Sequence, residues 1–240
     1  SRELNIDMKS APKESTFKKT MATIMRNRNL IVVFISYTVT LGTHCLYKDL
    51  GSTMIKNRCS PNTDADGTSL YSYTVLAGSI AGTVASLVAG PIGKVIGEKG
   101  LCYVGQAMGM IALAFVAFDA DGAYNYYWYT AAFALNRFGE GLDHPSFIQL
   151  CSEWASPEDR GMMLGLFQIG NSLGRSVFSL LQGYLYDWNY TASYFIAMAW
   201  PLIGYVCIAV ASVPVQAHML EKARREQACA EETPIESVPV

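Results

Sequence analysis

The chain has 240 residues, of which 51% are hydrophobic and only 16% are charged, and its formal net charge is −2. Soluble domains usually carry about a quarter charged residues, so this composition favours a membrane protein. The basic residues are not massed on one stretch, which argues against a nucleic-acid partner. The sequence has no Cys/His metal spacing, Gly-rich phosphate loop or catalytic serine motif, so we predict no metal, no cofactor and no enzymatic activity.

The first 28 residues are polar and basic. Lys18, Lys19, Arg26 and Arg28 stand just before the first apolar segment. An excess of Lys and Arg beside a membrane segment marks its cytoplasmic side. We therefore predict that residues 1–28 form a cytoplasmic lead-in.

Six largely uncharged segments follow, and each is long enough to cross the hydrocarbon core, which takes about 20 helical residues. They cover residues 29–47, 67–93, 101–118, 123–151, 161–186 and 193–215. We therefore predict an all-α, multi-pass integral membrane protein with a six-helix transmembrane bundle over residues 29–215. An even number of crossings puts both termini on the cytoplasmic side, and the acidic tail, residues 216–240, is predicted to be disordered.

A glycosylation sequon, Asn189-Tyr190-Thr191, lies between the last two segments. Such a match is only a formal acceptor motif. We interpret it as unmodified, because the loop is too short to hold it clear of the membrane.

The fourth segment contains four ionisable residues, which are costly in lipid and usually face a bundle interior or a water-filled cavity. Arg137, Glu140 and His144 share one helix face, and Asp143 is displaced from it. In a functional interpretation, Arg137 binds an anion or gates the path, and Glu140 or Asp143 carries a proton. In a structural interpretation, Arg137 and Glu140 neutralise each other. For Asp143 and His144 we favour a position near the cytoplasmic interface.

Arg175 lies in the middle of the fifth segment, beside Gly170 and Gly174, which allow another helix to approach closely. A guanidinium suits a carboxylate or a phosphate, so Arg175 is our main candidate for a substrate contact. The alternative is an ion pair with Glu140 or Asp143 across helices.

His44 and Lys48 lie one turn apart near the expected external end of the first segment. Lys48 is expected to extend its ammonium group outward to the interface. His44 either titrates in a proton-coupled cycle or forms a hydrogen bond between helices.

The connector between the second and third segments resembles the signature loop of the major facilitator superfamily. Residues 90–99 read Gly-Pro-Ile-Gly-Lys-Val-Ile-Gly-Glu-Lys, and the family pattern is Gly-x-x-x-Asp-Arg-x-Gly-Arg-Lys. Gly90, Gly97 and Lys99 match this pattern, whereas Lys94 stands where the family has its aspartate. The glycines permit a tight turn and close helix approach.

Two further patterns resemble the same family in order and spacing. Arg137-x-x-Glu140-Gly141 is similar to the Arg-x-x-x-Gly signature of a fourth helix, and residues 157–161, Pro-Glu-Asp-Arg-Gly, are similar to the connector that follows it. Together the three patterns cover most of residues 67–215. The resemblance implies one six-helix half of a transporter. The missing loop aspartate and the lead-in, which resembles a linker between halves, favour the C-terminal half, although a first half also fits.

The resemblance implies transport of a small solute by alternating access, with two halves facing each other across a central path. The buried arginines favour an organic anion, and coupling to a proton or another ion is left open. The complementary half would come from the same polypeptide or from a second chain. The alternative is a non-transporting membrane scaffold, a truncated paralogue with the same fold.

Overall fold

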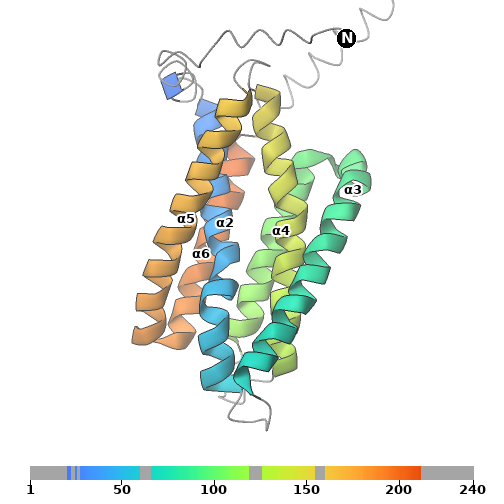
Figure 1. Cartoon of the computed structure of the whole chain (residues 1–240). Helices are drawn as coiled ribbons and strands as arrows, with labels where there is room; N and C mark the ends of the chain where they lie inside the picture. The colour runs from blue at the N-terminus through green and yellow to red at the C-terminus, as the bar shows by residue number, and fades with distance from the viewer. Residues whose placement is uncertain are drawn as a thin grey trace, which may run out of the picture.

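The computed structural model describes residues 21–22, 25, 28–59, 66–118, 126–154 and 160–211. Long helices account for nearly all of this part of the chain, and they lie roughly side by side (Figure 1). They are α2 (Arg28–Met54), the short π-helical η1 (Ile55–Cys59), α3 (Gly67–Ala117), α4 (Tyr126–Trp154), α5 (Arg160–Trp188) and α6 (Tyr190–Val210). The predicted all-α fold is confirmed. The lead-in through residue 20 and the tail from residue 212 onward lie outside the described residues.

Helix α3 folds back on itself at Gly97, so it has a first arm, residues 67–96, and a second arm, residues 98–117 (Figure 1). Leu70 and Val116 belong to one apolar core cluster, whereas a straight helix between them would be about 70 Å long. Gly97 has φ 75° and ψ 163°, a backbone conformation that is essentially restricted to glycine. The signature-loop glycine is therefore the residue at which the chain reverses.

Replacing Gly97 by alanine is expected to lower the free energy of unfolding by about 1–3 kcal/mol, because the side chain strains this backbone conformation. Gly90→Ala is the matched control, since its Cβ meets nothing within 4 Å. Thermal unfolding of the detergent-solubilised protein would compare the two variants. Equal midpoints would contradict the role of Gly97.

Helix α4 packs against both arms of α3 through facing glycines. A Cβ at Gly139 would lie 2.6 Å from the carbonyl oxygen of Gly105 in the second arm. A Cβ at Gly141 would lie 2.5 Å from the carbonyl oxygen of Gly82 in the first arm. Small residues on both partners let the helix backbones approach closely, as in other membrane helix pairs.

Helix α5 approaches α2 in the same way. A side chain on Gly174 would overlap the backbone carbonyl of Thr38, and one on Gly170 would lie 2.6 Å from the ring of Phe34. These contacts are the close helix approach that the glycine spacing predicts.

The outer surface of the first arm of α3 carries two kinds of side chain. An apolar stripe runs along one side and comprises Tyr73, Leu76, Ile80, Val84 and Leu87, all between 46% and 73% exposed. A polar stripe of exposed Ser79, Thr83 and Ser86 runs beside it. An apolar stripe of this length suits lipid, whereas the hydroxyl groups suit a wet surface.

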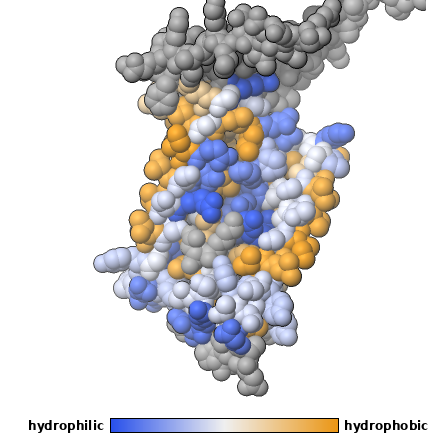
Figure 2. Space-filling model, viewed as in Figure 1, coloured by the Kyte–Doolittle hydropathy of each residue, from blue (hydrophilic) through white to orange (hydrophobic). Residues whose placement is uncertain are grey.

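Helix α5 repeats this division. Its exposed apolar residues are Ile169, Leu173, Val177, Leu180 and Tyr184, and its exposed polar residues are Gln168, Ser172, Arg175 and Ser176. Figure 2 shows the result on one face of the molecule, with hydrophilic side chains in the middle and hydrophobic ones at both edges. A polar band therefore runs down the centre of this face.

Within the part of the chain that the structure describes, three helical segments are long and apolar enough to cross a membrane, which supports an integral membrane protein. They are Arg28–Asn57, Gly67–Ala117 and Tyr190–Val210. Helices α4 and α5 are not among them, and both carry ionisable residues in mid-helix.

Candidate functional site

A groove of about 430 Å³ lies between the first arm of α3 and α4. It is lined by Ser79, Gly82, Thr83, Ser86, Arg137, Glu140, Gly141, His144 and Pro145. Its serine and threonine residues belong to the polar stripe of α3, so the groove opens onto the polar band. Hydroxyl groups, one guanidinium and one carboxylate thus converge on a single cavity, which is the usual make-up of a small-molecule site.

Arg137 and Glu140 form an ion pair within α4, and each side chain is about 20% exposed. The missing side chain of Gly78 makes room for Arg137 and for the neighbouring ring of Phe133. The pair is the self-neutralising contact of the structural interpretation. Its members also line the groove, as the functional interpretation requires.

Arg175 is exposed on the polar stripe of α5. Among the residues that the structure describes, Arg175 forms no ion pair. Glu140 is paired with Arg137 and Asp143 with His44, so neither of the two carboxylates we considered for Arg175 is its partner.

Asp143 lies in the protein interior. Its side chain is fully buried, and its Oδ2 atom lies 3.0 Å from Nε2 of His44. Helix α4 turns this residue away from the groove and towards α2 and the second arm of α3. His144, in contrast, is half-buried in the groove, where its ring stacks on Tyr37 at a centroid distance of 5.8 Å.

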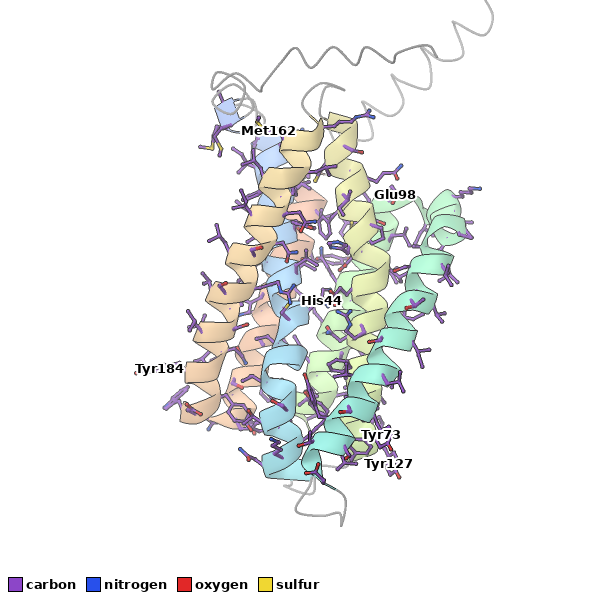
Figure 3. The ribbon with its side chains drawn as sticks, viewed as in Figure 1. His44, Tyr73, Glu98, Tyr127, Met162 and Tyr184 are labelled. Carbon is purple, nitrogen blue, oxygen red and sulfur yellow. The ribbon has the colours of Figure 1, made fainter. Side chains whose placement is uncertain are left out.

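His44 forms a hydrogen-bonded network between α2 and α4. Its Nδ1 atom lies 2.7 Å from Oδ1 of Asn136, and the Nδ2 atom of Asn136 donates to the His44 carbonyl oxygen at 3.1 Å. Figure 3 shows His44 near mid-height of the bundle. The side chain of Lys48 lies outside the described residues.

Asn136 is the member of this network that the sequence analysis missed. It directly precedes Arg137 in an apolar segment, and a polar amide at such a position needs hydrogen-bond partners. The second arm of α3 packs against this network through two glycines. A Cβ at Gly109 would lie 3.1 Å from the His44 ring, and one at Gly105 would lie 2.6 Å from Cβ of Asp143.

The residues of the signature loop lie at the turn of α3, at the end of the bundle where Figure 3 labels Glu98. Lys94 is exposed and Lys99 is half-buried. A Cβ at Gly93 would lie 3.3 Å from Oε1 of Glu98, so the glycine leaves space for that carboxylate beside the first arm. The loop is separate from the groove residues of α4.

Apolar outer stripes, a polar central band and a groove with paired charges favour an integral membrane protein of the transporter class. The chain belongs to the major facilitator superfamily, whose family model matches residues 22–237. The family comprises membrane transporters, which are not enzymes, and this agrees with the prediction of no enzymatic activity.

Several relatives are similar to parts of the chain. A galacturonate transporter of Dickeya chrysanthemi is 33% identical over 109 residues, which are 45% of this chain and 30% of the relative. A hexuronate transporter of Escherichia coli (strain K12) is 32% identical over 112 residues, 46% of this chain and 24% of the relative. A putative glycerol-3-phosphate transporter 2 of Arabidopsis thaliana is 22% identical over 214 residues, 84% of this chain and 42% of the relative. The chain thus spans less than half the length of each.

Proposed function

We propose that the chain forms one six-helix half of a secondary transporter that moves a small organic anion by alternating access. The six crossings would be α2, the two arms of α3, α4, α5 and α6. Helices α4 and α5 have 29 residues each, about 43 Å of helix, which is ample for the hydrocarbon core. The basic lead-in would place both termini on the cytoplasmic side.

The polar band supports a second half facing this one. In family members, two halves enclose the solute path between them. The band joins the polar stripes of α3 and α5, whereas the apolar stripes of the same helices are turned to the sides (Figure 2). A complementary half on this band would shield the groove from lipid. Lys94 in place of the loop aspartate favours the second half for this chain, with the first half as the alternative.

The excess of positive charge along the band is the observation that carries the choice of an anion. Arg137 and Arg175 are both cations, and Glu140 can neutralise only one of them. Asp143 does not compensate, because it is buried with His44. A carboxylate or phosphate would complete the charge balance and could take a bidentate contact from a guanidinium. The names of the relatives, which refer to galacturonate, hexuronate and glycerol-3-phosphate, fit this class.

Uptake into proteoliposomes that contain this chain and its complementary half would test the proposal. Galacturonate and glycerol-3-phosphate would be compared with galactose and glycerol, which have similar shapes and no charge. We expect saturable uptake of an anion and none of its neutral counterpart. If no anion enters under any gradient, the non-transporting scaffold gains support.

Arg175→Ala is expected to reduce anion uptake by about tenfold or more, because a hydrogen bond to a charged group is worth about 1.5–3 kcal/mol. Arg160→Ala is the matched control, since Arg160 is an exposed cation of the same helix at its first residue. Undiminished uptake by Arg175→Ala, at equal protein content, would show that Arg175 does not contact the solute.

A further inference from the structure

We infer that His44, Asn136 and Asp143 form a buried site for one proton, which can leave only when α2 separates from α4. His44 is 1% exposed and Asp143 is 0% exposed, and neither lines the groove. The site therefore differs from the proposed solute site in both position and chemistry.

Hydrogen-bond directions fix the number of protons that the site holds. The amide nitrogen of Asn136 donates to the His44 carbonyl oxygen, so its Oδ1 is the atom that faces Nδ1 of His44. Because Oδ1 only accepts, Nδ1 must carry a hydrogen. Between Nε2 of His44 and Oδ2 of Asp143, 3.0 Å apart, one further hydrogen completes the network. The pair is then neutral overall, whether that hydrogen resides on the ring or on the carboxyl group.

Loss of that proton has no good arrangement in the closed bundle. A ring with its hydrogen on Nδ1 would turn a lone pair towards the carboxylate of Asp143. Moving the hydrogen to Nε2 would instead turn a lone pair towards Oδ1 of Asn136 at 2.7 Å. Either form leaves two acceptors in contact and an uncompensated charge in the interior, which costs several kcal/mol.

Other ionisable groups around the pair come from all three helices that surround it. Tyr37 of α2 and Cys102 of α3 lie in the surroundings of Asp143, and His144 of α4 lies in those of both members. The surrounding glycines of α3, Gly105 and Gly109, offer no replacement hydrogen-bonding side chain. Release of the proton therefore requires water or another partner to reach the pair, and hence an opened contact between α2 and α4.

This site would couple a proton to the conformational cycle, a consequence that rests on the proposed transport function. The proton would stabilise the conformation in which α2 and α4 are in contact, and its release would favour the opened one. A ligand that binds two conformations unequally shifts the balance between them by that difference in affinity. One proton would then move with, or against, each anion.

Hydrogen–deuterium exchange of the full protein in detergent, without solute, tests the proton site directly. In the wild type, amides of α2 and α4 near His44 and Asp143 should exchange faster at mildly alkaline than at mildly acidic pH, beyond the intrinsic effect of pH on exchange. Asp143→Asn should abolish this difference, because an amide donates to Nε2 without a removable proton. Glu98→Gln, which neutralises a carboxylate in the turn of α3, should keep it.

Two results of the exchange experiment would overturn the proton site. One is a wild type whose protection at α2 and α4 does not change with pH, a measurement that does not depend on any variant folding. The other is an Asp143→Asn variant with the same pH dependence as the wild type.

Proteoliposome uptake tests the coupling separately. Asp143→Asn should reduce solute accumulation driven by a proton gradient by about tenfold or more, which is within the range of typical coupling energies. Exchange of labelled for unlabelled solute, which needs no proton gradient, should continue. If the wild type accumulates the anion to the same extent with and without a proton gradient, the coupling is overturned. A wild type that transports no anion would overturn the proposed function, and the exchange experiment would still decide the proton site.

Discussion

Gly139→Val is expected to destabilise the protein by about 1–3 kcal/mol or more, because it forces apart the crossing of α4 and α3. A Cβ at this position would lie 2.6 Å from the carbonyl oxygen of Gly105 and 3.1 Å from Cβ of Met108. A backbone carbonyl cannot turn aside as the end of a flexible side chain can, so the helices themselves must move. The same movement would disturb Asp143, one turn further along α4.

Gly165→Val is the matched control, because Gly165 is an exposed helical glycine of α5 with nothing within 4 Å of its Cβ position. Both substitutions change helix propensity by the same amount, so the difference between them reports packing. The midpoint of thermal unfolding in detergent would be measured for each. A midpoint for Gly139→Val equal to that of Gly165→Val would show that the close contact with Gly105 contributes nothing.

Arg137→Gln is expected to reduce anion uptake by about tenfold to a hundredfold, through two effects with the same sign. It removes a charged hydrogen-bond donor, worth about 1.5–3 kcal/mol. It also leaves the carboxylate of Glu140 unpaired in the groove, where it would repel an anion. Initial rates of uptake into proteoliposomes, normalised to folded protein, provide the measurement.

Two companion variants separate solute binding from a structural role of the ion pair. Arg137→Lys keeps the charge but loses the planar fork of the guanidinium, so uptake should recover only partly. Arg137→Gln with Glu140→Gln removes both charges, and it should restore any stability lost with the pair but not the uptake. If the double variant transports as well as the wild type, the pair is only a structural contact of α4.

The helices could be predicted from sequence because the length of an apolar run is a local property. Over its described part, each predicted segment falls within a helix to within one residue, and the chain reversal at Gly97 falls in the connector where Gly and Lys cluster. The glycine spacing in residues 170–174 likewise predicted a close helix partner. These signals need no knowledge of which helices are neighbours.

The pairing of the charged residues could not be predicted from sequence in this way, because it depends on which helices are neighbours. Glu140 and Asp143 are three residues apart, but α4 turns the first to the groove and the second into the interior. Only the contacts among α2, α3 and α4 bring Asp143 together with His44, which is 99 residues away in the sequence. The same contacts add Asn136, which no sequence motif had indicated. The sequence by itself determined an all-helical membrane chain with costly charges inside it. The tertiary structure decided which of them line a groove and which are buried with a partner, because burial and pairing are properties of packed helices and not of any one segment.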